Sequence, residues 1–182
     1  MNDYLSTWTL IRASGFLAYY LLTLSLGIGL LSTISIMKKK KGILIQLHQF
    51  SGWTGFLTII FHILLLWRDS YAPYSLAELF VPFGAKNEPL LSGLGTLSFY
   101  LFLIVLGSGD FFMKKLGKLW KRIHMLVFPA WLLMCIHGMA IGTDSSEPWA
   151  LLIYAIGISF ILVLGFLRKV DKKILKQAAN SK

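Results

Sequence analysis

Five long apolar runs occupy most of the chain and limit what it can fold into. Each has about the 20 mainly apolar residues that a helix needs to cross the hydrocarbon core of a bilayer. Inside lipid, helices and closed barrels satisfy every backbone hydrogen-bonding group, and runs of this length are typical of helices. We therefore predict an all-α integral membrane bundle, forming one domain over residues 1–182. Its five transmembrane helices are predicted at residues 10–37, 42–67, 90–112, 119–141 and 149–167.

The composition agrees with a protein whose solvent is a lipid bilayer. Hydrophobic residues make up 56% of the 182 residues and charged residues only 14%, too little polar material to cover a soluble domain. The net charge of +10 lies in short basic clusters between the apolar runs, so we expect no nucleic-acid partner. The first run follows no basic region and is too long for a signal core, so we expect it to remain as a span. No internal repeat is evident.

The basic clusters alternate along the chain and predict its orientation. Fifteen of the 18 Lys and Arg residues lie in three segments that follow the first, third and fifth runs, at residues 38–41, 114–122 and 168–182. By the positive-inside rule these segments face the cytoplasm. We therefore expect a multi-pass protein of the cell membrane, with its N-terminus outside and its C-terminus in the cytoplasm.

The longest connection on the predicted outer side, residues 69–89, contains a helix-start pattern. Ser75 is followed three residues later by Glu78, which fits a capping box. The pattern predicts a short amphipathic helix that lies over the outer mouth of the bundle.

All four histidines fall inside two of the apolar runs, with His48 and His62 in the second and His124 and His137 in the fourth. Ionisable side chains inside a membrane are costly, so their presence there indicates a function. Within each run the two histidines are 14 or 13 residues apart, which separates them by about 20 Å along a helix. Both runs cross the membrane in the same direction. His48 and His124 are therefore expected to pair toward the inner side, and His62 and His137 toward the outer side.

Paired imidazoles across a gap are the ligands that a six-coordinate haem iron takes, and this spacing stacks two such sites through the membrane. Zinc fits less well, because it needs three or four converging ligands and the nearest thiol is Cys135, which we predict to be a packing residue. Hydrogen bonding between helices is the structural alternative for the histidines. In a straight helix His124 and His137 would point about 140° apart. We expect either that Pro129 kinks the fourth helix or that the two haems approach it from different flanks.

The histidines also stand in two local patterns, Trp120-Lys-Arg-Ile-His124 and Ile136-His137-Gly138. With these patterns, nearly the whole chain resembles the ferric reductase and NADPH oxidase transmembrane domain superfamily. That superfamily includes the haem membrane subunit of bacterial methionine sulfoxide reductase systems. The resemblance implies two b-type haems (heme b). His48 and His124 would be the axial ligands of the inner haem iron, and His62 and His137 those of the outer one.

The resemblance implies roles for three further residues. Arg12, in Ile-Arg-Ala-Ser-Gly near the outer end of the first run, resembles a family arginine that pairs with haem propionates, as a two-pronged guanidinium can. An interfacial arginine that reaches lipid headgroups is the alternative. The family often places an aromatic residue between the haems, for which Trp131 and Phe128 are candidates. Plain core packing is the alternative for both.

By this resemblance the chain is expected to carry electrons as the haem-containing membrane component of an oxidoreductase, and no catalytic residue is assigned. No Gly-x-Gly-x-x-Gly follows a strand-like segment, so we expect a separate cytoplasmic flavin reductase, or reduced FMN or FAD, to supply the electrons. The acceptor would be an extracytoplasmic ferric chelate or partner oxidoreductase. Leu64, Leu65 and Leu66 stand where the oxidases keep a polar residue, so superoxide production is not expected.

Two other classes of protein are alternatives. A quinol-linked cytochrome b that anchors a larger oxidoreductase would keep both haems but take its electrons from the membrane. A haem-free transporter or scaffold would use the histidines for a metal or for packing.

Overall fold

The computed structural model describes residues 6–110, 115 and 117–180, and the regular secondary structure of these residues is helical. Helix α1 (Thr7–Leu31) begins at Ser6, whose hydroxyl accepts the N–H of Thr9 and so caps the first turn. The helices that follow are the 3-10 helix η2 (Ser35–Lys40), α2 (Lys41–Arg68), α3 (Leu76–Phe80), α4 (Pro89–Asp110), α6 (Lys118–His124), α7 (Val127–Ile141) and α8 (Pro148–Asn180).

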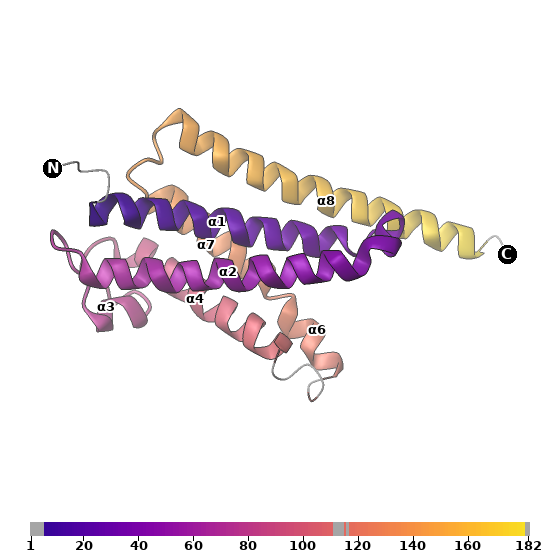
Figure 1. Cartoon of the computed structure of the whole chain (residues 1–182), viewed down its shortest axis with the longest axis horizontal. Coiled ribbons are helices and arrows are strands. Elements are labelled where there is room, and N and C mark those ends of the chain that lie inside the picture. Colours follow the sequence, from indigo (N-terminus) through magenta and orange to yellow (C-terminus); the bar gives the residue numbers. More distant parts are fainter. Residues whose placement is uncertain (1–5, 111–114, 116, 181–182) are drawn as a thin grey trace.

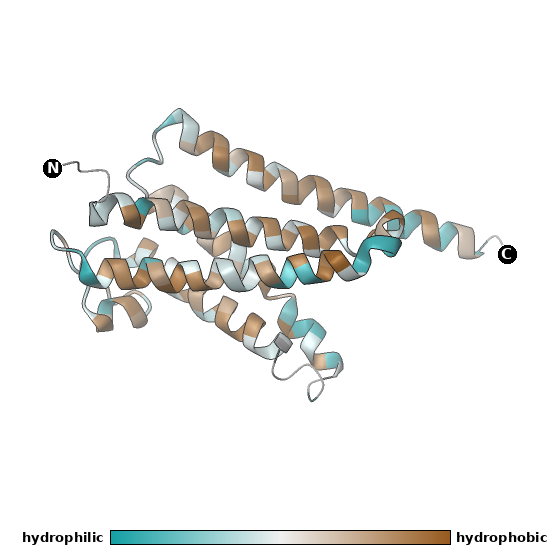
Figure 2. Ribbon diagram, in the orientation of Figure 1, coloured by the Kyte–Doolittle hydropathy of each residue, from teal (hydrophilic) through white to brown (hydrophobic). Residues whose placement is uncertain are grey.

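Five helical segments are long and apolar enough to cross a membrane: Thr7–Leu31, Ser35–Arg68, Pro89–Gly109, Lys118–Ile141 and Pro148–Asn180. Figure 2 shows apolar residues along most of these segments, and hydrophilic residues at the α1–α2 connection and on the last turns of α8. The predicted bundle of five transmembrane helices is therefore confirmed. Phe112, where the third span was predicted to end, and Lys114 of the second basic cluster lie outside the described residues. The orientation of the termini stays a prediction.

The first helix ends earlier than predicted, at Leu31 instead of residue 37. The hydroxyls of Ser32 and Thr33 donate to carbonyls of the preceding turn, at 2.8 and 2.7 Å. Hydroxyl groups that bond back in this way compete with the helical pattern. Ile34 then has an extended backbone, and η2 leads into α2.

The fourth span is interrupted, as the position of Pro129 predicted. Helix α6 ends at His124 and α7 begins at Val127. Proline has no N–H, so the carbonyl of Met125, one turn before Pro129, accepts the N–H of Phe128 instead, at 3.2 Å. The fourth span therefore has a two-residue break directly after His124, close to Pro129.

The helices pair as two antiparallel hairpins (Figure 1). Helices α1 and α2 share the most extensive interface, and α4 packs against α7, with α6 also on α4. Helix α8 packs along α1, and the two hairpins contact each other far less than the partners within each do. We call the end of the bundle where α1 begins and α2 finishes the N-terminal end. The opposite end, where α8 finishes, is the C-terminal end.

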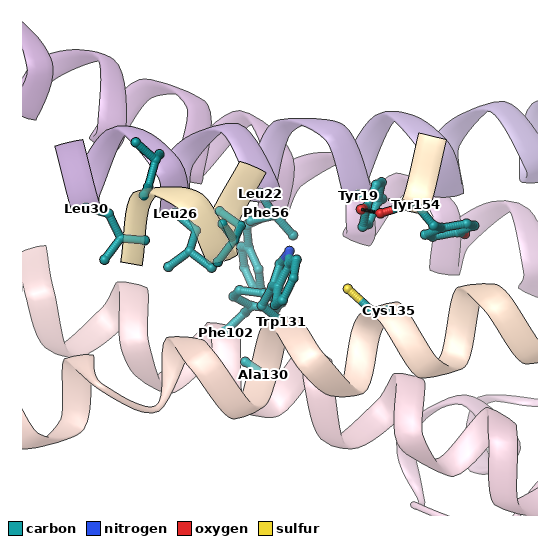
Figure 3. Close-up of a cluster of buried hydrophobic side chains, with 12 residues drawn as sticks. Tyr19, Leu22, Leu26, Leu30, Phe56, Phe102, Ala130, Trp131, Cys135 and Tyr154 are labelled. Atoms are coloured by element: carbon teal, nitrogen blue, oxygen red, sulfur yellow. Dashed lines mark hydrogen bonds between the residues drawn. The ribbon is translucent and has the colours of Figure 1, made fainter. Parts of the chain in front are cut away.

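A cluster of buried side chains joins both hairpins to α8 (Figure 3). Its members include Tyr19, Leu22 and Leu26 of α1, Phe56 of α2, Phe102 of α4, Trp131 and Cys135 of α7, and Tyr154 of α8. Glycines let α1 and α8 approach: a Cβ on Gly27 would overlap Phe160, and one on Gly157 would overlap the Tyr19 hydroxyl. Small residues bring membrane helices together because lipid supplies no hydrophobic drive for their association.

Helix α8 is longer than its predicted span of residues 149–167. Its 33 residues extend about 50 Å, well beyond the roughly 30 Å of a hydrocarbon core. The carboxylate of Asp171 accepts the N–H of Ser35 at 3.0 Å and also accepts its hydroxyl. These two bonds tie the polar extension of α8 to the start of η2.

The predicted capping box of α3 is confirmed. The hydroxyl of Ser75 accepts the N–H of Glu78, whose carboxylate accepts the N–H and the hydroxyl of Ser75 at 2.9 and 2.7 Å. The same carboxylate accepts the N–H of Lys86 at 3.1 Å. Thr96 of α4 donates its hydroxyl to the carbonyl of Leu79 at 3.0 Å, which holds α3 against α4.

The α1–α8 interface can be tested with two substitutions on one helix. Gly157→Ala places a methyl group against the Tyr19 hydroxyl, and we expect it to destabilise the protein by about 1–3 kcal/mol through overpacking. Gly165→Ala is the control, because no side chain lies within 4 Å of its added Cβ. Thermal unfolding in detergent measures both, and equal unfolding temperatures for the two variants would contradict this interface.

The α3 segment should depend on pH through Glu78. Its hydrogen bonds, first of all that from the Ser75 hydroxyl, lower the Glu78 pKa from 4.5 to about 2. A lowered pKa means that the charged carboxylate stabilises the segment above pH 4.5, and that this stabilisation is lost as the pH falls toward 2. Hydrogen-exchange protection of the Ser75 and Lys86 amides should fall across that window. In Glu78→Gln, which cannot titrate, protection that fell equally would contradict the assignment.

Candidate functional site

The predicted inner histidines come together at the C-terminal end of the bundle. The ring centroids of His48 on α2 and His124 at the end of α6 lie 5.9 Å apart, with the ring planes at 72°. Two imidazoles on opposite sides of one metal ion would have centroids about 6 Å apart. This separation is the sum of two metal–nitrogen bonds of about 2 Å each and the distance from each nitrogen to the centre of its own ring. The separation of this pair therefore matches what one shared metal ion requires.

The predicted outer histidines share a cavity at the N-terminal end. His62 of α2 and His137 of α7 both line a space of about 260 Å³ between the two hairpins. Its walls are mainly apolar, and Arg12 and Asp144 lie among its few charged residues. A concave, apolar space with a few converging polar groups is typical of a small-molecule or cofactor site.

Three of the four histidines hydrogen-bond a backbone carbonyl through Nδ1. His48 bonds the Ser25 carbonyl at 2.8 Å, His62 the Ile11 carbonyl at 3.0 Å, and His137 the Leu91 carbonyl at 2.8 Å. A carbonyl can only accept, so each Nδ1 carries the proton, and in a neutral ring Nε2 then keeps its lone pair. Such a bond fixes the tautomer and the orientation of a metal-binding histidine.

Each of these carbonyls stands four residues before a glycine, and the histidine ring lies against that glycine. A Cβ added to Gly29 would be 3.1 Å from the His48 ring, one on Gly95 would be 2.8 Å from His137, and one on Gly15 would be 3.5 Å from His62. In a helix the carbonyl of residue i lies beside residue i+4. We call this pairing of a carbonyl with a glycine four residues later a glycine notch.

The notches reveal a repeat that sequence analysis missed. Gly15 and Gly29 are 14 residues apart on α1, as are His62 and His48 on its antiparallel partner α2. Helix α4 repeats this spacing with Gly95 and Gly109. Matched glycine and histidine spacings on neighbouring runs were the signal available in the sequence.

His124 is the exception. Its Nδ1 is buried and has no hydrogen-bond partner among the described residues, and the same holds for Nε1 of Trp120, one turn earlier. An unpaired buried polar atom costs about 1–3 kcal/mol. The His48–His124 site is therefore the less completely hydrogen-bonded of the two.

Arg12 lines the cavity of the His62–His137 pair, and its guanidinium is paired with Asp144. Both Nε and Nη2 lie 2.5 Å from the same carboxylate oxygen. Asp144 belongs to the α7–α8 connection, and sequence analysis gave it no role because the two residues are far apart in the chain. The pair leaves the arginine at the edge of the cavity, where another carboxylate can reach the guanidinium.

The two candidate aromatic residues lie on α7 between the levels of the histidine pairs. Trp131 is buried in the core (Figure 3). Its Nε1 donates to the Thr23 hydroxyl of α1 at 2.9 Å. Phe128 is partly buried and packs against the same cluster. Cys135 is a free, buried thiol in this core, beside Trp131 and Tyr19. Both aromatics are packing residues, and Trp131 is also held in one orientation.

No three His, Cys, Asp or Glu side chains in residues 6–110, 115 and 117–180 are placed to hold a bare metal ion together. Haem iron needs fewer ligands from the protein than a bare metal ion does. The macrocycle supplies four ligands, so the chain has to supply only two. The donor sets of both histidine pairs fit that requirement. In comparisons with known proteins, no protein-family model and no solved structure matched the chain.

The glycine notches predict the protonation of each histidine ring. In protein prepared without haem, ¹⁵N spectra of labelled histidine should show the Nδ1-protonated tautomer for His48, His62 and His137. Gly95→Ala forces a methyl group against His137 and should remove this signature from that ring alone. Gly107→Ala, on the same helix with nothing within 4 Å of its Cβ, should leave it unchanged. If Gly95→Ala left the His137 spectrum intact, the notch would play no part.

Proposed function

We propose that the chain binds two b-type haems and conducts electrons between them across the membrane. The observation that carries the proposal is the pairing of four intramembrane histidines at two levels. In three of them an Nδ1–H bond to a carbonyl at a glycine notch leaves Nε2 unprotonated in the neutral ring. The resemblance to the ferric reductase and NADPH oxidase transmembrane domain superfamily agrees with this pairing.

The residues of each level have distinct tasks in this proposal. His62 and His137 would hold one iron within the cavity, and His48 and His124 the other, at the opposite end of the bundle. The carbonyls of Ile11, Ser25 and Leu91 hold the proton on Nδ1 and so strengthen Nε2 as a donor. When bound, haem supplies one-electron oxidation and reduction of its iron.

Arg12 is the residue proposed to hold a haem propionate. It lies at the edge of the cavity, and Asp144 already orients its guanidinium. A guanidinium presents several N–H donors in a fixed fork, so it can serve Asp144 and a second carboxylate together. Trp131 stands between the two levels, where a packed indole shortens the apolar distance that an electron crosses.

The distribution of charge supports a direction for this transfer. By the positive-inside rule, the basic clusters favour an orientation with the His48–His124 level toward the cytoplasm. A cytoplasmic flavin reductase, or reduced FMN or FAD, would donate electrons at that level. The acceptor at the His62–His137 level would be an extracytoplasmic ferric chelate or partner oxidoreductase. The protein would thus be the haem-containing component of an oxidoreductase in the cell membrane.

Removing one histidine pair at a time tests the pairing. The purified protein should show the reducible Soret and alpha bands of b-type haem. His48→Ala with His124→Ala should leave one haem and abolish reduction by a flavin donor from the cytoplasmic side. His62→Ala with His137→Ala is the matched variant; it should also leave one haem, which the cytoplasmic donor still reduces. Retention of both haems in either double variant would contradict the pairing.

A quinol-linked cytochrome and a haem-free protein give different results in the same experiment. Reduction of the wild-type haems by a quinol in detergent, but not by reduced flavin, would favour the quinol-linked alternative. Absence of b-type bands after expression with added haem would favour the haem-free one.

A further inference from the structure

Helix α4 carries a fourth glycine notch, made by Val105 and Gly109. It lies 14 residues after the notch of Leu91 and Gly95, the spacing that separates the two notches of α1. The Val105 carbonyl accepts the hydroxyl of Ser108 at 3.0 Å, just as the Ile11 carbonyl accepts that of Ser14 at 2.9 Å. This site therefore shares its carbonyl–glycine spacing with the other notches and its serine bond with the Gly15 notch, and it holds no histidine.

Trp120 lies at the fourth notch in place of a histidine. The atom nearest to a Cβ on Gly109 would be Nε1 of Trp120, at 3.6 Å. Nε1 has no hydrogen-bond partner in the described part of the chain, so no hydrogen bond of the N–H holds the indole at Gly109. The Trp120 ring in turn contacts His124, with centroids 5.3 Å apart and planes at 31°.

The break in the fourth span explains why His124 needs this support. Helix α6 has only seven residues and ends at His124, two residues before α7 begins. His124 also lacks the Nδ1 hydrogen bond that orients the other three histidines. Its contact with Trp120 links it, through the indole, to Gly109 on α4.

We propose that Trp120 is the positioning residue of the inner histidine pair: its indole lies against Gly109 of α4 and orients the His124 ring by contact. This inference rests on the proposed binding of haem by His48 and His124. Ring contact is less directional than a hydrogen bond to a carbonyl. The inner haem is therefore the more easily lost of the two, and its ligand field depends on an aromatic ring at residue 120.

Two substitutions of Trp120 test the proposal. Trp120→Leu removes the ring and should weaken retention of the inner haem about 10- to 100-fold, as loss of groups that orient metal ligands does. Trp120→Phe keeps a ring without the N–H and should restore retention to within about threefold of wild type, in line with ring contact. Haem release to apomyoglobin measures retention. The low-spin electron paramagnetic resonance signal of the inner haem should shift in Trp120→Leu and return toward wild type in Trp120→Phe.

A second pair of variants addresses the notch without changing Trp120. Gly109→Leu should displace the indole and mimic Trp120→Leu. Gly107→Leu, two residues away at a site with no atom within 4 Å of its Cβ, should retain the inner haem. The outer haem reports on folding in every variant and should be retained throughout.

Each outcome decides between the claims. If wild type binds two haems and Trp120→Leu keeps the inner one unchanged, the positioning role is wrong and the haem proposal stands. Parallel loss of both haems in Trp120→Leu, or failure of Trp120→Phe to restore the inner haem, also overturns the positioning role. A wild-type protein without haem overturns both.

Discussion

The hydrogen bond from a histidine Nδ1 to a helix carbonyl at a glycine notch is the interaction on which the candidate site depends. It satisfies one polar nitrogen inside the membrane and leaves the other with a lone pair for a ligand. The glycine is needed because a side chain at that position would stand between ring and carbonyl. At Gly95 an added Cβ would already lie 2.8 Å from the His137 ring. His48, His62 and His137 therefore each depend on a glycine of the partner helix at matching depth.

This requirement explains how the bundle is assembled. The notches of α1 receive the histidines of α2, and a notch of α4 receives His137 of α7, so each hairpin orients its own ligands. The two hairpins contact each other much less, and the cavity of His62 and His137 lies between them. The core around Trp131 joins them at mid-depth, where its Nε1 bonds Thr23 of the opposite hairpin. The chain is thereby closely packed at its centre and keeps a cavity beside His62 and His137.

Much of this arrangement could be predicted from the sequence, because hydrophobic length and charge act over whole segments. The five spans, the capping box at Ser75 and the interruption near Pro129 each follow from local chemistry. The pairing of His48 with His124 followed from their equal depth. The end of α1 at Leu31 could not be predicted from the sequence. Nothing in an apolar run indicates that the hydroxyls of Ser32 and Thr33 will donate to carbonyls of the preceding turn. The ion pair of Arg12 with Asp144 depends on how two distant segments of the chain pack together, and no local sequence pattern predicts that contact.

The glycine notches are an intermediate case. Gly15, Gly29 and Gly95 are present in the sequence, but glycine is common in membrane helices. A single glycine in such a helix therefore does not predict a contact with a histidine. Their meaning appears only when the register of two antiparallel helices sets each glycine against a histidine. His124 and Trp120 show the limit of such a rule, since the break after His124 shifts the register and places the indole at Gly109.

The central claim is that the two histidine pairs are two haem sites, and the most direct test is the amount of haem bound per chain. Protein expressed with added haem and purified in mild detergent should contain two b-type haems per chain, measured as the pyridine haemochrome against quantitative amino-acid analysis. A folded protein that binds no haem would contradict the account. A ratio of one would contradict the claim that both pairs are sites.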